Sequence, residues 1–447
     1  EDGIRDSVNG LVGSEMCIRD RYRYHHLFAD LIRYVLRQED PDRERFLRRR
    51  AAEYLSLQAD VAAAAEQYLE LGDVEGVLSI VSEHGRSFYE RNECATLVRW
   101  LTAAASMRAD PPPELGVQLL AAQIAALDSP AAAETYWRIT RRGNLTGGQE
   151  ATCHALFCLL GLDDLPPDEI EHAASAALRR LAGANDDELV DVLGVGGRAT
   201  IELFARFMPA VAAFHRGNLQ VAVDQFEAVL ELDGMQYPVW KIYTLGYLGL
   251  VHAWSGDLLH AESFAEKAVE LARHNSLQGH VGLVYAHHSL ALIALDRLDL
   301  TAVAEELRLA DLAAQQSDRA ALRAMHRLLG ATRLTFVNGP VSALAELEAT
   351  PPPALEPPIF ANAERDLHIR LRIASGNRLA ARDLATGRSV GDGARFDLAF
   401  AAGDLTAANA ILDAWGPLPD NRRSALGLLI RRAALLAAEG FRRDALR

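Results

Sequence analysis

The sequence predicts an all-α protein, a solenoid built from helical hairpins. Half of its 447 residues are hydrophobic, and Ala, Leu, Arg and Glu are common while β-branched runs are rare, which favours helices. One turn motif recurs: Gly, then Asn or Asp, then Leu, with Ala five residues after the Gly. It occurs at Gly217-Asn218-Leu219 with Ala222, Gly256-Asp257-Leu258 with Ala261, and Gly403-Asp404-Leu405 with Ala408. Such internal repetition is typical of solenoids, whose units bury apolar faces against their neighbours.

Each part of this turn motif has a physical role. Gly ends one helix because it adopts the left-handed conformation of a C-terminal cap at little cost. The Asp or Asn side chain caps the next helix, and the small Ala lets that helix approach the previous one closely. Weaker copies of the motif occur at Gly72-Asp73-Val74, Gly376-Asn377 with Ala381, Gly440 with Ala445, Arg297 with Ala302, and Gly339 with Ala343.

The spacing of the motif sets the size of the repeat. Gly217 and Gly256 are 39 positions apart, and Gly256 and Arg297 are 41 apart, which is longer than the standard tetratricopeptide unit. Around Gly256 the chain nevertheless resembles the tetratricopeptide pattern, with Leu248-Gly249 before the turn and Ala261 and Ala268 after it. We therefore expect long tetratricopeptide-like hairpins.

Other helices are expected on both sides of the clear repeats. Apolar residues at 27, 28, 31, 32, 35 and 36 share one helical face, and Pro41 separates this helix from an Arg-rich helix that extends to Leu57. An Ala-rich helix, Val61 to Leu71, follows. Pro166-Pro167-Asp168 has the pattern of a helix start. Breaks are expected at 111–113, 143–148, 194–197, 351–353 and 357–358, where Pro or Gly is concentrated.

The first part of the chain resembles the middle of MalT-like regulators, large ATP-dependent transcription factors with a LuxR-type DNA-binding end. The resemblance rests on Tyr22-Arg23-Tyr24-His25-His26-Leu27-Phe28, Leu47, Arg49-Arg50-Ala51-Ala52-Glu53-Tyr54, Gly72-Asp73 and Leu97-Val98-Arg99-Trp100-Leu101. Together with the breaks and repeats, it gives the following expected organisation: 1–21, a non-native or disordered tail without helical period; 22–60, by resemblance the end of a winged-helix region; 61–110, a helical linker block; 111–198, irregular helical hairpins; and 199–447, a tetratricopeptide-like region that the resemblance implies is a sensor.

The resemblance implies ATP or ADP as cofactor of the full-length family, but no cofactor for this segment. A winged-helix His of the family contacts the β-phosphate of ADP, and His25 stands at that position. The chain continues with His26 where the family usually has Pro. An ordinary histidine at a helix start is the alternative, because a nucleotide site also needs the NTPase domain.

We expect the native chain to continue beyond both ends, and residues 7–21 resemble translated adapter sequence.

Composition limits the classes of partner. The formal net charge of −15 argues against direct binding to a nucleic-acid backbone, which needs a surplus of Lys and Arg. The resemblance to MalT-like regulators implies that DNA is contacted only through a further C-terminal domain. Four scattered cysteines do not form a disulfide framework. No membrane-spanning run or signal peptide is present. We expect a cytoplasmic protein without membrane contact.

No constellation of residues predicts catalysis or a metal site. Gly194-Val195-Gly196-Gly197 lacks the Lys of a phosphate-binding loop, so a loop between hairpins is favoured. Cys153 and Cys158 are spaced so that their thiols splay around a helix, and core cysteines are the simpler interpretation. His287 and His288 are sequence neighbours that point about 100° apart on a helix. We predict no catalytic residue and no metal ligand.

A ligand or partner groove is the remaining candidate. In tetratricopeptide arrays the first helix of each hairpin lines the concave surface, where a small-molecule effector or a regulatory protein would bind. The turn register places these residues there: Phe204, Phe207, His215, Tyr243, Trp254, His287 and Arg333. Burial in the interhelical core is an equal alternative for the Phe residues.

Two functions are compatible with these observations. One is a non-catalytic sensor and oligomerisation region of a MalT-like regulator that self-associates when its effector binds. The other is a stand-alone scaffold that binds protein partners through the groove. An enzyme has no supporting constellation.

Overall fold

The computed structural model describes residues 14–15, 23–24, 26–91, 93–162, 165–193, 197–314, 319–349, 352, 356–386, 390–415 and 421–441. The elements before the first proline-rich break are β1 (Ser14–Glu15), β2 (Arg23–Tyr24), α2 (His26–Glu39), α3 (Pro41–Leu57), α4 (Val61–Leu71), α5 (Val74–Glu90) and α6 (Cys94–Ser106). The following elements are α7 (Pro113–Ala125), α8 (Ser129–Arg141), α9 (Gly147–Leu159), η1 (Leu160–Leu162), α10 (Pro167–Gly183), η2 (Asp186–Glu188), α11 (Arg198–Arg216), α12 (Leu219–Leu230), η3 (Asp233–Gln236), α13 (Pro238–Ser255), α14 (Leu258–His274), η4 (Val281–Leu283), α15 (Val284–Asp296), α16 (Leu300–Ala314), α17 (Ala320–Val337), α18 (Pro340–Ala349), α19 (Pro358–Ala374), α20 (Arg378–Ala385), α21 (Asp392–Ala402), α22 (Leu405–Trp415) and α23 (Arg422–Ala438).

The chain divides into two compact units. The first comprises residues 1–85 and 99–111, and the second comprises residues 86–98 and 112–447. In the first unit α3 and α4 form a hairpin, and Arg49 of α3 is 2.9 Å from the carboxylate of Asp73. The apolar face expected on the first helix is present on α2 but faces solvent, with Leu27 66% and Leu31 56% exposed.

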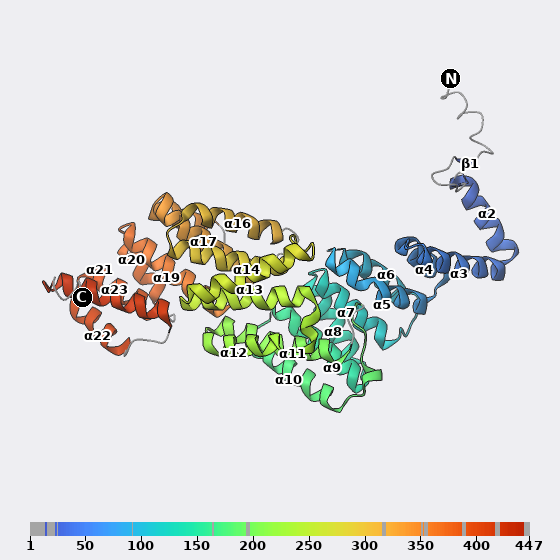
Figure 1. Ribbon diagram of the computed structural model, residues 1–447, viewed down its shortest axis with the longest axis horizontal. Helices are drawn as coiled ribbons and strands as arrows, with labels where there is room; N and C mark the ends of the chain where they lie inside the picture. The colour runs from blue at the N-terminus through green and yellow to red at the C-terminus, as the bar shows by residue number, and fades with distance from the viewer. Residues whose placement is uncertain are drawn as a thin grey trace, which may run out of the picture. The chain divides into compact units, whose positions relative to one another are not determined.

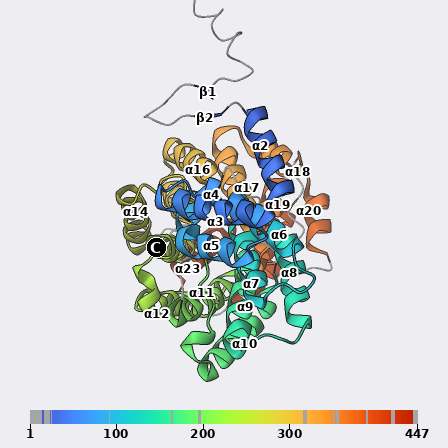
Figure 2. The same ribbon diagram turned by 90° about the vertical axis from the view of Figure 1, so that its right-hand side faces the viewer.

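The second unit is a series of antiparallel helical hairpins (Figure 1). Successive helices pair as α7–α8, α9–α10, α11–α12, α13–α14, α15–α16, α17–α18, α19–α20 and α21–α22. The first helices of neighbouring hairpins also touch, as in the pairs α9 with α11 and α13 with α15. Figure 2 shows α9 to α12 side by side, in agreement with the contacts of α11 with α9 and α10. The predicted all-α solenoid of hairpins is confirmed.

The turn motif has the geometry that its residues predict. Gly217, Gly256 and Gly403 are left-handed C-caps with φ of 87°, 84° and 79°. The paired Ala222, Ala261 and Ala408 are fully buried. At Ala261 the two helices also approach closely, since a Cβ at Gly249 would lie 3.2 Å from the Ala261 carbonyl oxygen.

The capping role expected for the second residue of the motif is correct only at some turns. Asp404 accepts a hydrogen bond from the amide of Ala407 at 2.9 Å, and Asp73 accepts one from Gly76 at 3.0 Å. Asn218 and Asp257 do not cap their helices through the side chain. At Asp257 the carboxylate faces His260 and Arg422 instead, because these side chains compete for the oxygens that a cap would use.

Helix starts follow the expected prolines. α7 begins at Pro113 and α10 at Pro167, at the N-terminal positions where proline is favoured. The break expected at 143–148 is shorter, since Thr146 caps α9 in a capping box with Gln149.

A short antiparallel ladder, which the sequence did not predict, pairs Ser14 with Tyr24. No described helix combines the length and hydrophobicity of a bilayer span.

The solenoid of the second unit closes on itself. Helix α11 contacts α19 although four hairpins separate their starts, and Phe360 of α19 lies 5.8 Å from Phe214 and 5.5 Å from Trp254, between ring centroids. Every residue of α13 from Ile242 to Val251 is buried. Aromatic side chains therefore fill this part of the space between the first helices.

Candidate functional site

A cavity of about 320 Å³ lies within the second unit. The ends of α5, α7, α9 and α16 surround it, together with the starts of α6, α11 and α13, the turn before η4, and the residue that precedes α17. The apolar part of its lining includes Ile124, Leu127, Leu156, Leu159, Leu162, Leu193, Phe204 and Trp240. The polar part includes Arg86, Tyr89, Glu90, Tyr237, Tyr243, His280 and Arg319. This size and mixture are typical of ligand pockets.

Arg319 places a positive charge in this lining. It is 6% exposed, and its Nη1 donates a hydrogen bond to the Tyr243 hydroxyl at 3.2 Å. The guanidinium carbon lies 5.9 Å from the centroid of the same ring, within range of a cation–π interaction. The hydroxyl group and the aromatic ring of Tyr243 therefore both orient the guanidinium.

Arg86 and Glu90 neutralise each other at the cavity. The Arg86 Nε donates to the Glu90 carboxylate at 2.9 Å, and the guanidinium also lies 5.1 Å from the centroid of Tyr237. This ion pair lies in the lining beside the ring of Tyr237, while Arg319 is held by Tyr243.

His280 and Tyr89 lie beside Arg319 and stay neutral near pH 7. Burial, aided by the Arg319 charge, lowers the pKa of His280 to about 4, and burial raises the pKa of Tyr89 well above its usual value. The His280 Nδ1 accepts a hydrogen bond from the amide of Gly282 at 3.1 Å, which assigns the ring proton to Nε2. Both rings pack edge to face, 5.6 Å apart.

The chemistry of the lining suits binding and not nucleophilic attack. Burial raises the pKa of Cys94 to about 12, so its thiol is protonated at neutral pH and is a poor nucleophile. A cation, neutral hydrogen-bonding groups and aromatic faces together favour an anionic ligand with an apolar or aromatic body.

Two of the predicted groove residues line the cavity. Phe204 and Tyr243 both face it, and Trp240 lies between them, with its ring centroid 4.7 Å from Phe204 and 5.4 Å from Tyr243. These rings form a continuous aromatic wall from α11 to α13.

Three other groove residues lie in the closed aromatic core. Phe207 is fully buried against Phe226 and Tyr247. His215 is buried beside Phe360, and burial lowers its pKa to about 4. Trp254 packs with Phe360 and against the core of α17 and α18. His215 and Trp254 pack on Phe360 because α19 meets α11 where an open solenoid would leave a groove, whereas rings of α12 and α13 cover Phe207.

The two polar groove residues make local interactions away from the cavity. His287 Nδ1 is 2.8 Å from the carboxylate of Glu306, and Arg333 Nε donates to the carbonyl oxygen of Leu300 at 2.9 Å. The first interaction links α15 to α16 within one hairpin. The second links α17 to α16 of the preceding hairpin. The seven predicted residues therefore do not share a single surface.

Other sequence candidates have simple placements. His25 and Gly194-Val195-Gly196 lie outside the described residues. Cys153 and Cys158 are buried, and burial raises the pKa of each thiol to about 12, so they behave as core residues.

Sequence reasoning missed His280, Tyr89 and Arg319. His280 and Arg319 lie in short connections, and Tyr89 lies near a helix end. A groove prediction that uses only the first helix of each hairpin therefore does not include them. Arg319 directly precedes α17, and nothing in the local sequence distinguishes it from the other arginines of this region.

No family model and no curated protein matches the chain. Among solved structures, a Rap protein in complex with competence and sporulation factor has a TM-score of 0.51 at 12% identity, with 75% of this chain and 94% of that chain covered. The apo form of RapI has a TM-score of 0.40 at 10% identity, covering 80% and 98%. Yeast Tom70 has a TM-score of 0.33 at 12% identity, covering 91% and 98%. At these identities the likeness concerns the fold alone: the chain is a tetratricopeptide-like helical-repeat protein.

Proposed function

We propose that this chain is a non-catalytic binding module whose cavity receives an acidic segment of a partner protein. The observation that carries the proposal is the buried guanidinium of Arg319 in the lining of the cavity. A carboxylate placed there would gain a charge-assisted hydrogen bond from a group already oriented by Tyr243. Such hydrogen bonds contribute about 1.5–3 kcal/mol.

The side chains around Arg319 determine which uncharged groups of a ligand the cavity favours. The wall of Phe204, Trp240 and Tyr243 offers flat apolar surface to the body of the ligand. His280 offers a neutral ring N–H, because burial and Arg319 keep it unprotonated. A partner segment with an acidic residue next to an apolar or aromatic one matches this pattern.

The fold supports a binding role in general terms. Helical repeats present several helix ends to one ligand, and the cavity is lined in this way. The Rap protein of similar fold is known in complex with competence and sporulation factor, which agrees with a binding module.

Peptide selection tests the proposal. A phage-displayed random peptide library is panned against the full chain, and the selected peptides are measured by fluorescence anisotropy. We expect acidic-apolar peptides, with affinity at least about tenfold weaker for Arg319→Met, since one charge-assisted hydrogen bond is worth this much. Tyr243→Phe should give a smaller loss because only the orienting hydroxyl is removed.

Arg308→Met is the matched control. Arg308 is exposed on α16 and pairs with Glu305, so its loss should leave affinity unchanged. Equal affinity of the parent and Arg319→Met, both with native circular dichroism, would show that the cavity is not the binding site.

A sensor region of a MalT-like regulator is the second candidate. It is favoured by the residues of 22–28 and 97–101, which resemble that family, and it would make the module a cytoplasmic, self-associating receptor with DNA contact through another domain. Reading the genomic frame tests it: a P-loop upstream and a helix-turn-helix downstream are expected, and natural start and stop codons near Tyr22 and Arg447 would contradict it.

A further inference from the structure

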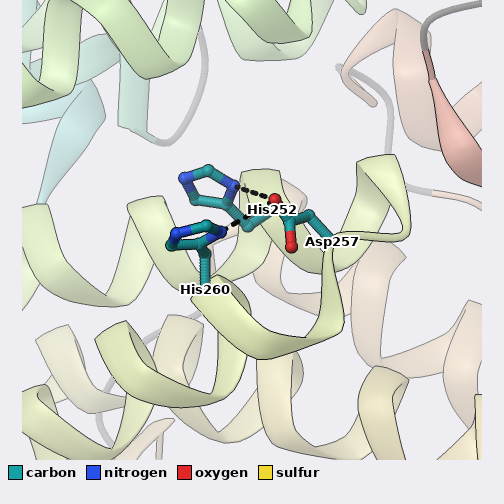
Figure 3. Close-up of side chains that lie close together, drawn as sticks. All are labelled: His252, Asp257 and His260. Carbon is teal, nitrogen blue, oxygen red and sulfur yellow. Dashed lines mark hydrogen bonds and ion pairs between the residues drawn. The ribbon is translucent and has the colours of Figure 1, made fainter.

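We propose a divalent transition-metal site, best suited to Zn²⁺, formed by His252, Asp257 and His260 at the turn between α13 and α14. Figure 3 shows the two imidazole rings beside one carboxylate. The site is separate from the cavity and does not depend on the proposed function.

The ligand atoms are close enough for one ion. His260 Nδ1 is 2.9 Å and His252 Nδ1 is 3.9 Å from the same oxygen, Asp257 Oδ2, and one ligand atom from each residue lies within 4.8 Å of the others. Tetrahedral Zn²⁺ with bonds of about 2.0–2.2 Å needs ligand atoms roughly 3.4 Å apart. The separations of 2.9 Å and 3.9 Å lie on either side of that value, so coordination would require side-chain rotation.

The carboxylate of Asp257 is directed toward the histidines and away from its expected partner. At comparable turns Asp404 and Asp73 cap the following helix through a backbone amide, whereas Asp257 makes no side-chain cap hydrogen bond. Its Oδ2 faces His260 and His252 instead. Asn218 at the equivalent turn is also without a side-chain cap, so it is the approach of Asp257 Oδ2 to both imidazoles, and not the missing cap, that distinguishes this turn.

The histidines are particular to this copy of the turn motif. They stand four residues before and four residues after Gly256. The same positions around Gly217 hold Ala213 and Val221, and those around Gly403 hold Ala399 and Ala407. The general turn thus needs no histidine, so the pair is an addition with a separate role.

The surroundings favour an oriented imidazole ligand. His252 stacks on Phe264 with ring centroids 5.5 Å apart and an interplanar angle of 16°, which restricts the rotation of its ring. His260 is exposed and can adjust. Two imidazoles and one carboxylate suit Zn²⁺ and leave a fourth position for water or a partner's side chain.

Arg422 makes the proposal testable in both directions. Its Nη1 is 3.2 Å from the other carboxylate oxygen, Asp257 Oδ1. The guanidinium therefore holds the carboxylate in place but also opposes a nearby cation. Because Arg422 is exposed, removing its charge should strengthen metal binding.

Isothermal titration calorimetry of the tag-free, chelator-treated full chain with ZnCl₂ tests the site. We expect one Zn²⁺ per chain, binding about tenfold or more weakened in His260→Ala and in Asp257→Asn, and binding several-fold tighter in Arg422→Gln. Co²⁺ should give visible absorption bands that are lost in His260→Ala.

His274→Ala is the control, since His274 is an exposed histidine of the same helix whose Nδ1 lies 2.9 Å from the Glu270 carbonyl oxygen; it should bind Zn²⁺ like the parent. Absence of Zn²⁺ binding, or equal affinity of the parent and His260→Ala, would overturn the proposal. Equal affinity of the parent and Asp257→Asn would contradict coordination by Asp257.

Discussion

Glu356 shows at the scale of one residue how burial changes ionisation. Burial and the neighbouring charge of Glu364 raise the pKa of its carboxyl to about 7, although Arg327 opposes the shift. Arg327 is engaged with Glu364 at 2.7 Å and with the Leu347 carbonyl oxygen at 2.8 Å. The Glu356 carboxyl is therefore protonated in the folded chain over a range in which an unfolded chain would lose the proton.

This difference predicts a pH-dependent stability. Because the folded pKa is above the ordinary value of 4.5, the contribution of Glu356 is complete below about pH 4.5 and is lost as the pH rises through about 7. Glu356→Gln should therefore raise the melting temperature at pH 8 relative to the parent and have little effect at pH 4.5. Thermal denaturation followed by circular dichroism measures the difference. A constant difference across this range would contradict the assignment.

Two helical glycines differ in what surrounds them. A Cβ added at Gly148 would lie 2.6 Å from the backbone carbonyl of Glu188, whereas one added at Gly330 would meet nothing within 4 Å. Gly148→Ala should destabilise the protein by more than about 1 kcal/mol, and Gly330→Ala should stabilise it by about 0.5–1 kcal/mol. Urea denaturation of both variants measures this, and equal effects would contradict the packing of α9 on η2.

At the scale of the element, the hairpin depends on a small residue after each turn. Ala261 is fully buried, and a Cβ at Gly249 of α13 would lie 3.2 Å from the Ala261 carbonyl oxygen. The two helices thus touch along their backbones, as the tetratricopeptide-like pattern of Leu248-Gly249 and Ala261 predicts. Side-chain volume, and not hydrophobicity alone, fixes their distance.

Ala261→Leu should therefore destabilise the α13–α14 hairpin. Overpacking of a close-packed position costs about 1–3 kcal/mol. Leu259→Ala is the control, because Leu259 is two residues away and exposed, and it should change the free energy of unfolding by less than about 0.5 kcal/mol. Denaturant titration gives both values, and a neutral Ala261→Leu would show that the helices can separate without cost.

At the scale of the whole second unit, closure decides what lies inside. Phe360 joins α19 to α11 and α13 through Phe214, His215 and Trp254. Because these helices are distant in sequence, their contact depends on the small rotations accumulated over the intervening hairpins. The aromatic cluster holds that closed arrangement.

Phe360→Ala should weaken the closure. Truncating a buried Phe costs about 3–5 kcal/mol, and Phe336→Ala is the exposed control. The pKa of His215, which burial holds at about 4, should rise toward its ordinary value when the closure loosens. NMR titration of the histidines measures it, and an unchanged pKa in a destabilised variant would place the loss elsewhere.

Local physics made the hairpins predictable from sequence. Gly at a left-handed cap, Pro at a helix start and Ala at a close approach act within a few residues, so Gly256, Pro167 and Ala261 indicate their own environment. The His252-Asp257-His260 cluster is also local, but its spacing crosses a turn and matches no single-helix ligand pattern, so sequence reasoning did not find it.

The sequence by itself determined the kind of repeat, the order of the hairpins and most of their turns. The tertiary structure alone decided which surface is open: it packed His215 and Trp254 against Phe360 of α19, covered Phe207 with Phe226 and Tyr247, and brought Arg319 to Tyr243 from 76 residues away. The physical reason is that turn chemistry is fixed by neighbours in the chain, whereas closure and cavities depend on rotations summed over many repeats.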